Sequence, residues 1–390
     1  MSMNQSKSHS YIAEFDRAIF FTYMILCIIG LGVLMDISSV RENMNFFYKQ
    51  LAYLVPALLI MFSALYFPNL QKLQKYNFMW VLIVLGLLIG VLAFGVEVNG
   101  AKRFLKLGPL LFQPSFLARI VLILYLAGLL SKKQEEIKTT NISDLIKTLL
   151  PFLVTMLLMY LLILKEKHLS TLVISASTLL GMFWIAGIRK RFVMALFAVA
   201  LIGGLIVIAK GASYRGERIE IYKKYSLFTK DTVAHVDREK EYQTRESLTA
   251  LSSGKLFGTG IDKGRAKHFF LPESRTDYVF TIIGEETGFA GAMLVFGLQC
   301  FLFWRAFKVS LRQEDLYLRY VGLGLALNLF LNVLVNVGVA MSAIPSTGVT
   351  LPFISYGGTS LLILSRLSKY LSVYIIVPAA KSLPVSFTII

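Results

Sequence analysis

Cysteine and histidine are scarce in this sequence, with only two and four residues respectively. Cys27 and Cys300 both lie inside apolar segments, which is typical of small buried side chains and not of a disulfide or a metal pair. The histidines are scattered and form no metal-ligand motif. Phosphate-binding loop, HExxH, CxxC and nucleophile-elbow patterns are absent as well. These absences exclude the metal and nucleophile sites that a sequence reveals most readily.

Acidic residues are also few, and long polar stretches are almost absent. The chain has 23 Asp and Glu against 40 Lys and Arg, a net charge of +17, yet 56% of its 390 residues are hydrophobic and its mean hydropathy is +0.66. A soluble domain of this length is rarely so apolar. Because the cations lie in short loops between apolar runs, they indicate membrane topology and contact with lipid head groups, not nucleic acid. The longest polar segment, residues 210–276, leaves no room for a separate soluble domain of ordinary size.

Apolar runs of about 20 residues, in contrast, recur along nearly the whole chain. They predict an all-α fold, a polytopic membrane helix bundle of about ten transmembrane helices. A large extracytoplasmic loop is expected between the seventh and eighth helices. The predicted spans are residues 17–38, 47–66, 77–95, 114–131, 147–164, 168–187, 191–209, 277–305, 318–342 and 351–378.

The short loops give the expected orientation, because cytoplasmic loops of membrane proteins are enriched in Lys and Arg. The basic loops follow the second, fourth, sixth and eighth spans, so they share one side, together with both termini. We expect a cytoplasmic segment 1–16 followed by a retained signal anchor, a single transmembrane domain 17–378 with the loop 210–276 outside, and a cytoplasmic tail 379–390. The loop cations are Lys72, Lys75, Lys132, Lys133, Lys138, Arg189, Lys190, Arg191, Arg305, Lys308 and Arg312.

Three outward segments differ in composition from ordinary loops. Residues 99–115, NGAKRFLKLGPLLFQPS, mix Gly, Pro and cations with apolar residues, which favours an interfacial or re-entrant segment whose backbone is covered by protein. The second segment is the end of the long loop. The third, residues 343–360, has Pro and Gly at the entry to the tenth span. Because all three lie on the outer side, we expect them to meet over one site.

Carboxylates near the start of the eighth span need an explanation. An acid in lipid costs roughly 2.5–3.5 kcal/mol on insertion scales, yet the sequence has Asp277, Glu285 and Glu286 here. Asp277 is interpreted either as an acid that caps the helix N-terminus or as a general base at the membrane surface. Glu285 is expected to face the interior of the bundle and to have a partner there.

Cations on the outer side also allow two interpretations. They are solvated loop charges, or they form a clamp for the phosphates of a lipid-linked substrate. The residues alone therefore indicate an outward-facing polar site on a helical membrane protein and leave its chemistry open. These cations are Lys102, Arg103, Lys106, Lys263, Arg265 and Lys267.

Three motifs resemble those of a known family. They are NGAKRFLKLGPLLFQPS, KHFFLPESRTDYVFTIIGEETGFAG and STGVTLPFISYGGTSL, in this order along the chain. Together with the number of spans, they resemble the SEDS family of FtsW, RodA and SpoVE, with the FtsW-like branch favoured. The Gly-x-Gly that the family has ahead of the second motif matches Gly258 and Gly260.

The resemblance implies a peptidoglycan glycosyltransferase that polymerises lipid II at the outer face of the bacterial cytoplasmic membrane, in cell division or cell-shape maintenance. The family's essential aspartate, in a Pro-Glu-x-x-Thr-Asp-Phe pattern, matches Asp277, with Tyr278 in the Phe position. The implied partners are a class B penicillin-binding protein and other divisome or elongasome membrane proteins, without nucleic acid. The implied substrate-binding residues are Lys102, Arg103, Lys267, Glu273, Thr276, Ser355, Tyr356, Gly357 and Gly358.

This chemistry needs only one catalytic carboxylate. Glycosidases use a second carboxyl group, whereas an inverting transfer from a pyrophosphate donor needs a base for the acceptor hydroxyl and cations for the departing charge. The resemblance therefore implies Asp277 as the base. Lys102, Arg103 and Lys267, or a divalent cation such as Mg or Mn, would hold the pyrophosphate, and no organic cofactor is expected.

The sequence departs from the family pattern at two acids. Phe116 stands where Glu usually follows Gln-Pro-Ser, His168 stands at the Asp of Pro-Asp-Leu-Gly-Thr, and Arg119 has the usual Lys position. We expect Phe116 and His168 to lie close together, and Arg119 to pair with Glu285 or Glu166 as a structural or activating polar pair. These departures leave two other functions open, a non-catalytic division scaffold and a transporter or flippase of lipid-linked substrates.

Overall fold

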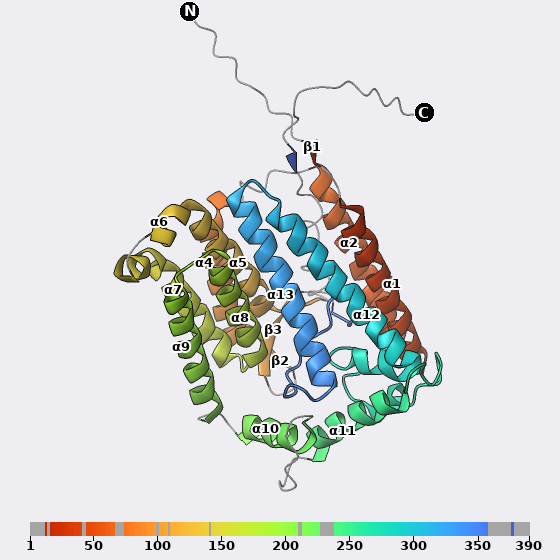
Figure 1. The fold of residues 1–390 in the computed structure, drawn as a ribbon. Coiled ribbons are helices and arrows are strands. Elements are labelled where there is room, and N and C mark those ends of the chain that lie inside the picture. The colour runs from red at the N-terminus through yellow and green to blue at the C-terminus, as the bar shows by residue number, and fades with distance from the viewer. Residues whose placement is uncertain are drawn as a thin grey trace, which may run out of the picture.

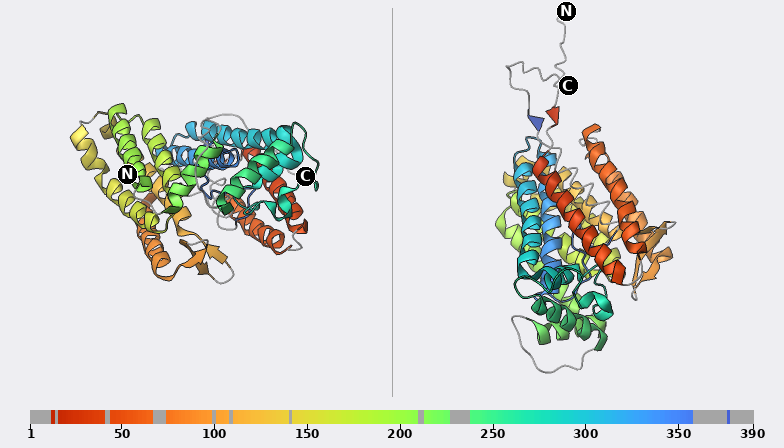
Figure 2. Two further views of the ribbon diagram at one scale, coloured as in Figure 1. Left: turned by 90° about the horizontal axis from the view of Figure 1, so that it is seen from below. Right: turned by 90° about the vertical axis from the view of Figure 1, so that its right-hand side faces the viewer.

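The computed structural model describes residues 12–13, 16–40, 44–66, 74–98, 101–107, 110–139, 142–209, 213–226, 238–357 and 376–377. Long helices run side by side as a bundle, and two further helices lie across one end of it (Figures 1 and 2). The bundle consists of α1 (Arg17–Val40), α2 (Asn45–Tyr66), α4 (Asn77–Phe94), α5 (Pro114–Lys132), α7 (Ile142–Lys165), α8 (Leu169–Ile185), α9 (Lys190–Ala209), α12 (Val279–Leu311) and α13 (Leu316–Ala340), and the short α6 (Gln134–Thr139) joins α5 to α7.

The helices fall where the apolar runs predict them. Each of the first nine predicted spans coincides with one helix, while the tenth, residues 351–378, lies mostly outside the described residues. Within the described part, α1, α4, α5, α7, α12 and α13 are long and apolar enough to cross a membrane. The chain is therefore a polytopic helical membrane protein, and the exact number of ten spans stays a prediction.

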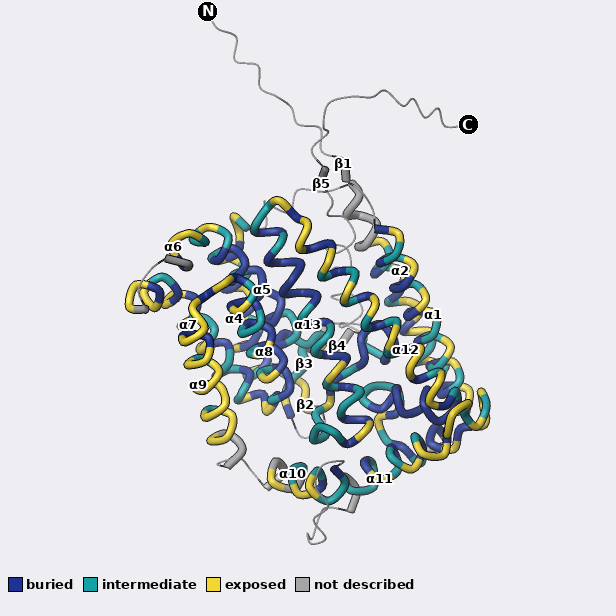
Figure 3. Tube along the Cα trace, in the orientation of Figure 1, coloured by how far each residue is buried: buried dark blue, intermediate teal, exposed yellow. Residues whose placement is uncertain are grey.

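Helices α5 and α13 form the centre of the bundle. In their most apolar stretches 78% and 67% of the residues are buried, against 22–39% in α1, α4, α7 and α12. The outer helices instead expose large apolar side chains, such as Phe21, Leu82 and Leu205. Much of α7 and α9 is coloured as exposed in Figure 3. Such side chains need no protein partner in a bilayer, because lipid tails are as apolar as leucine.

The segment after α4 contains a small sheet, and its interfacial or re-entrant position stays a prediction. Strands β2 (Val96–Val98), β3 (Ala101–Leu107) and β4 (Leu110–Phe112) pair antiparallel in the order β2-β3-β4. Neighbouring strands therefore satisfy part of one another's backbone hydrogen bonds. The Asn-Gly dipeptide between β2 and β3 is a hairpin signal in the sequence.

Helix α12 is broken at Gly288, whose φ of 70° and ψ of −171° are not helical. The loop residues 255–260 lie against this break and replace the hydrogen bonds that the helix loses there. A Cβ atom at Gly258 or Gly288 would lie 2.0 or 2.3 Å from facing backbone atoms, so both positions require glycine. The four hydrogen bonds are Thr259 N–H to Glu285 C=O (2.9 Å), Gly260 N–H to Glu286 C=O (3.1 Å), Phe289 N–H to Lys255 C=O (2.9 Å) and Ala290 N–H to Leu256 C=O (3.0 Å).

The long loop between α9 and α12 is largely folded. It contains α10 (Ser213–Tyr225), α11 (Arg238–Ser253) and the π-helical turn η1 (Ala266–Phe270), and α10 and α11 cross the lower end of the bundle in Figure 1. The Ser247 hydroxyl joins α11 to α13 by donating to the Ala340 carbonyl (2.9 Å). At the opposite end β1 (Ile12–Ala13) pairs antiparallel with β5 (Ile376–Val377). These two strands therefore lie on the side of the bundle away from α10 and α11 (Figure 1).

Candidate active site

Asp277 lies in a tight turn directly before α12. The amides of Thr276, Asp277 and Tyr278 all donate to the Glu273 carbonyl, at 3.1–3.3 Å, and Glu273 itself has a φ of 54°. Helix α12 begins at Val279, and its N-cap residue is Tyr278, without a side-chain capping bond. The interpretation of Asp277 as a helix-capping acid is therefore wrong, because the turn places its carboxylate outside the helix.

Helix α13 fixes the backbone of this turn. The Asn336 side-chain amide donates to the carbonyls of Asp277 (2.8 Å) and Val349 (2.6 Å). Gly348, with a φ of 70°, lies so close that a Cβ there would be 3.3 Å from Asp277 Oδ2. A single buried amide thus links the turn to the segment 346–357, which lies against the carboxylate.

Ser355 joins the same two segments. Its hydroxyl donates to the Thr276 carbonyl (2.5 Å) and accepts from the Leu351 amide (2.8 Å), and the Tyr356 amide donates to the Arg275 carbonyl (2.9 Å). The Ser355 side chain is buried and occupied by these backbone partners. The structure therefore gives it a structural role and not the substrate contact that the resemblance implies.

Asp277 opens into a cavity of about 490 Å³. Its wall combines cations, carboxylates, aromatic rings and backbone, contributed by α2, the β3–β4 region, α5, α8, α13 and the turn before α12. The residues that line it are Phe46, Lys49, Tyr53, Arg103, Phe104, Leu111, Gln113, Phe116, Arg119, His168, Thr171, Ile174, Glu273, Thr276, Asp277, Asn332, Gly348, Val349, Thr350, Tyr356 and Gly357.

The environment of Asp277 suits a base that works near neutral pH. Burial and the nearby negative charge of Glu273 raise the pKa of Asp277 from its usual 3.8 to about 7. Arg218, Arg103 and the Thr276 hydroxyl oppose this shift only in part. General bases are most effective when their pKa lies near the working pH. Asp277 is therefore a carboxylate that can accept a proton under physiological conditions.

Arg103 is the cation of the sheet that reaches the cavity. Its Nε and Nη2 groups donate to the carbonyls of Glu166 (3.3 Å) and Lys167 (3.0 Å), just after the C-terminus of α7. Unpaired carbonyls at a helix end attract cations. Two hydrogen bonds thus fix the guanidinium group next to the end of α7, and the Arg103 side chain lines the cavity. Lys102, the next residue on β3, is exposed and does not line the cavity.

His168, one of the two departures from the family pattern, is a buried neutral side chain. Burial, with the charges of Arg103 and Arg119, lowers the pKa of His168 to about 3. The Gln113 amide donates to its Nδ1 (3.1 Å), which assigns the proton to Nε2. Ser115 Oγ also lies 3.2 Å from Nδ1. Phe116, the other departure, follows Ser115 and lines the same cavity, so both replacements face one space.

Arg119 does not form the pair that the sequence predicts. Its Nη1 donates to Asn332 (3.1 Å), and its guanidinium lies 4.2 Å from the centre of the Phe116 ring. Glu166 is buried, and its carboxyl oxygens make no hydrogen bond with any residue that the structure describes. Burial raises the pKa of Glu166 to about 8, with nearby Ser115 and Arg103 opposing the shift. An aromatic ring and an amide have thus replaced the expected acid as the partners of Arg119.

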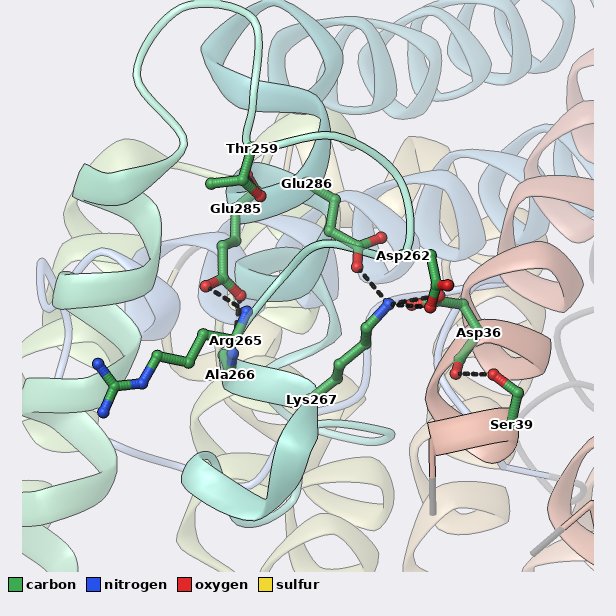
Figure 4. A network of polar contacts seen from close by, with 9 residues as sticks. All are labelled: Asp36, Ser39, Thr259, Asp262, Arg265, Ala266, Lys267, Glu285 and Glu286. Atoms are coloured by element: carbon green, nitrogen blue, oxygen red, sulfur yellow. Dashed lines mark hydrogen bonds and ion pairs between the residues drawn. The ribbon is translucent and has the colours of Figure 1, made fainter. Parts of the chain in front are cut away.

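Glu285 faces the loop before η1 and not Arg119. Its carboxylate accepts from the amides of Arg265 (2.8 Å) and Ala266 (3.0 Å), as Figure 4 shows. The predicted pair of Glu285 with Arg119 is therefore wrong. The prediction that Glu285 has an internal partner is confirmed, because two backbone amides satisfy its oxygens.

Lys267 lies in a second polar centre, separate from the cavity. Its ammonium group is fully buried and contacts Asp36 Oδ1 (2.5 Å), Glu286 Oε1 (2.8 Å) and Asp262 Oδ1 (3.0 Å) (Figure 4). We call these four residues the Lys267 cluster. Although burial disfavours the charged form, the three carboxylates raise the pKa of Lys267 above its usual value. The implied role of Lys267 as a phosphate ligand is not compatible with this position, because the ammonium group already contacts three carboxylates.

The other implied site residues fall into two groups. Glu273, Thr276, Tyr356 and Gly357 line the cavity beside Asp277, whereas Gly358 lies outside the described residues. Sequence reasoning missed Phe46, Lys49 and Tyr53, which recur on one face of α2 at helical spacing and line the cavity. The available signal was a lysine flanked by aromatic residues at the outer start of the second span. Without the fold, nothing connected that helix face with Asp277.

Comparison with known proteins adds independent information. The model of the FtsW/RodA/SpoVE family, described as "Cell cycle protein", matches residues 16–374. The chain is 33% identical over 365 residues to the "Probable peptidoglycan glycosyltransferase FtsW" of Saccharophagus degradans, with 89% of each chain covered. It is also 33% identical over 299 residues to "Stage V sporulation protein E" of Bacillus subtilis, covering 74% of this chain and 77% of that protein.

Solved structures give a similar result. A chain of a peptidoglycan synthase complex that coordinates polymerization and crosslinking has a TM-score of 0.71 and 27% identity. The rod shape determining protein RodA of Thermus thermophilus has a TM-score of 0.64 and 26% identity. Both similarities cover 92% of this chain and 96% of the other chain.

Proposed function

Because this chain belongs to the FtsW/RodA/SpoVE family of cell cycle proteins, we propose that it is a peptidoglycan glycosyltransferase that polymerises lipid II into glycan strands. The observation that carries the proposal is the Asp277 carboxylate, which has a pKa near 7 and shares one cavity with cations from α2, β3 and α5. A base and a set of cations are the two components that glycosyl transfer from a pyrophosphate requires.

In the proposed reaction, Asp277 accepts the proton of an acceptor hydroxyl while that oxygen attacks the anomeric carbon of the donor sugar. The new C–O bond forms as the bond from the anomeric carbon to the pyrophosphate oxygen breaks, and the lipid pyrophosphate leaves with the electron pair. In this proposal the transfer inverts the anomeric carbon, because the acceptor oxygen attacks it directly, on the side opposite the departing pyrophosphate. The backbone bonds from Asn336 and Glu273 hold the turn in position during this step.

Lys49, Arg103 and Arg119 are the cations that line the cavity, and we assign them to the pyrophosphate. Arg103 is the best anchored, because two carbonyls beyond the end of α7 fix its guanidinium. Planar guanidinium groups contact phosphate oxygens with two donors at once, whereas an ammonium group acts as a point charge. Arg103 and Lys49 therefore replace Lys102 and Lys267 as phosphate ligands in this proposal.

A divalent cation, Mg or Mn, fits the same cavity if the substrate supplies most of its ligands. Within the described residues no group of three His, Cys, Asp or Glu side chains is arranged to hold a metal. Glu273, which lines the cavity together with Asp277, would be the protein ligand, because Asp277 has to keep its lone pair for the proton. Mg is often bound by one or two carboxylates together with substrate phosphates. Such an ion would supply positive charge to the departing pyrophosphate.

We also propose the outer face of the bacterial cytoplasmic membrane as the location of the reaction, with both termini in the cytoplasm. The basic short loops support this orientation, as does the pairing of β1 with β5 at the end of the bundle opposite α10 and α11. The proposed partner is a class B penicillin-binding protein, together with other divisome or elongasome membrane proteins. The similarity to a chain of a peptidoglycan synthase complex supports a partner of this kind.

The test is glycan synthesis by the purified full-length chain from purified lipid II, with and without the cognate transpeptidase. We expect polymer in the presence of the partner. Movement of lipid II across a vesicle membrane without polymer would favour a transporter instead. Binding of the transpeptidase with neither polymer nor transport would favour a scaffold.

A further inference from the structure

Helices α1 and α12 run antiparallel and are joined by buried ion pairs at two levels. At one level Arg305 Nε contacts Asp16 Oδ2 at 2.9 Å, and the Asp16 side chain is only 2% exposed. At the other level Lys267 joins Asp36 of α1 to Glu286 of α12 (Figure 4). The two helices are thus held together at one point near each end of their contact.

The spacing of these levels matches the thickness of a membrane. Asp16 and Asp36 are 20 residues apart, and Glu286 and Arg305 are 19 residues apart. At 1.5 Å per residue both intervals correspond to about 30 Å, the thickness of a typical hydrocarbon core. Trp304, which is 50% exposed beside Arg305, is typical of a membrane boundary. The charged levels therefore mark the two boundaries of the bilayer.

This assignment leaves the start of α12 outside the hydrocarbon. The helix has 33 residues, or about 50 Å at 1.5 Å per residue, which is longer than the hydrocarbon core of about 30 Å. The segment after Gly288 is sufficient to span the core, so the break lies at the boundary on the side of α10 and α11. Glu285 and Glu286 are consequently at the membrane surface, where their charge costs little lipid desolvation.

Loop residues 255–265 lie at that same boundary. Their backbone is hydrogen-bonded to both sides of the Gly288 break, so their depth in the membrane follows from that of α12. In Figure 1 the chain between α11 and α12 forms the lower right edge of the molecule, beside the end of α1. The loop therefore reaches the lateral surface of the bundle and does not lie over its centre.

The outer surface of this loop combines apolar and basic side chains. Phe257 is 80% exposed, Ile261 75% and Leu256 53%, and Phe289 beside them on α12 is 61% exposed. Lys255, Lys263 and Arg265 are exposed on the same loop. Its acid, Asp262, is paired with Lys267. Because Asp262 is itself 74% exposed, the exposed charges of the loop are three cations and one acid. Large apolar side chains next to a net positive charge are the composition of an interfacial membrane anchor.

We propose that residues 255–265 form a membrane anchor that inserts Leu256, Phe257 and Ile261 into the bilayer interface and binds anionic phospholipid phosphates through Lys255, Lys263 and Arg265. The side chains are at the correct depth, because the ion-paired levels fix the boundary. The positive charge favours an anionic lipid over a zwitterionic one. Because backbone hydrogen bonds already hold the loop, little conformational entropy is lost on insertion.

The depth of the loop is tested with the full-length protein in nanodiscs of phosphatidylglycerol and phosphatidylcholine. Phe257→Cys carries an environment-sensitive fluorophore in a Cys300→Ala background, in which Cys27 is buried. Thr249→Cys on α11 is the matched control, since it is exposed but lies farther from the Gly288 break along the chain. Lipids with a nitroxide near the head group should quench the fluorophore at position 257 at least about threefold more than at position 249.

The preference for anionic lipid is tested with nitroxide-labelled phosphatidylglycerol and phosphatidylcholine as alternative quenchers at position 257. We expect about threefold stronger quenching by the anionic lipid, and a ratio near one in the Lys255→Glu/Lys263→Glu variant. Lys223→Glu on α10 should leave the ratio unchanged.

Three results would overturn the proposal. The first is a fluorophore at position 257 that remains in water. The second is equal quenching by the two lipids, which would remove the anionic part. The third is a fluorophore at position 257 that leaves the aqueous environment only after a class B penicillin-binding protein is added. That result would make this surface a protein docking site.

Discussion

The Asp277 cavity and the Lys267 cluster both combine carboxylates with cations, and only ten residues of sequence separate Lys267 from Asp277. In the cluster, three carboxylates surround one fully buried ammonium group, and all four side chains are at hydrogen-bonding distance. In the cavity, Asp277 has a raised pKa, and no ion pair shorter than 4 Å is recorded for it among the described residues. The first centre is closed by its own contacts, whereas the second is open toward a space of about 490 Å³.

The difference shows how the same residue types serve stability in one place and chemistry in the other. A buried lysine that is already satisfied has no donor to offer a ligand. In contrast, a carboxylate whose charged form is destabilised by its surroundings binds a proton more readily. The predictions below test whether the two centres are as separate as their geometry indicates.

The largest effect is expected for Asp277→Asn. We expect polymerisation to fall by about 100-fold or more, because the amide cannot accept the proton of the acceptor hydroxyl. Since the folded protein raises the pKa of this acid, ionised Asp277 destabilises the fold above its pKa, and this cost is absent below the unfolded value of 3.8. The melting temperature of the variant at pH 8 should therefore equal or exceed that of the wild type. Near wild-type polymerisation would remove the catalytic role.

Lys267→Met should act on stability. Removing the cation leaves the buried carboxylates of Asp36 and Glu286 without their common partner, and breaking a buried pair typically costs about 3–5 kcal/mol. Thermal unfolding in detergent measures this loss. The control is Lys263→Met on the exposed loop, for which a change within about 0.5 kcal/mol is expected. A loss of polymerisation activity with unchanged stability would instead support a substrate-binding role for Lys267.

The pH dependence of polymerisation should identify the carboxylate that works as base. We expect the rate to fall about tenfold per pH unit below pH 7, because only ionised Asp277 accepts a proton. The Glu273 charge contributes to the raised pKa, so Glu273→Gln should move this acid limb to lower pH. Arg218→Gln should move it to higher pH, since the Arg218 charge lowers the same pKa. An acid limb that neither variant shifts would show that another group titrates.

The smallest effect is expected for Ser355→Ala. The hydroxyl joins the Thr276 carbonyl to the Leu351 amide, so its loss should reduce stability by about 1–2 kcal/mol. The KM for lipid II should stay within about twofold, because the buried hydroxyl does not line the cavity. A large rise in KM with normal stability would contradict this assignment and make Ser355 a substrate ligand.

The helices and the position of the base were predictable from sequence. Apolar runs gave nine helices at the correct residues, and the motif around Asp277 pointed to the family, with relatives named FtsW in agreement with the favoured branch. These features are local, since each depends on residues adjacent in the chain. The ten-span count and the orientation remain predictions.

The partners of the charged residues were not predictable. Lys267 precedes Asp277 by ten residues, yet it pairs with Asp36, which is more than 200 residues away in the sequence. Arg119 contacts Asn332 and the Phe116 ring, whereas the sequence suggested an acidic partner, Glu285 or Glu166. Such contacts depend on how the helices pack, and a single sequence contains no direct record of that packing.

The four backbone bonds between loop 255–260 and the break in α12 also fix the length of that loop. Two carbonyls and two amides on the loop must meet four groups on the helix in a set order. Deleting or adding one residue there would shift this order and leave polar groups unpaired at the edge of the lipid. An epitope tag or fluorescent protein is therefore expected to disrupt the fold if inserted between Lys255 and Gly260, although this stretch is exposed and rich in glycine. Exposure alone is a poor guide to where this chain accepts an insertion.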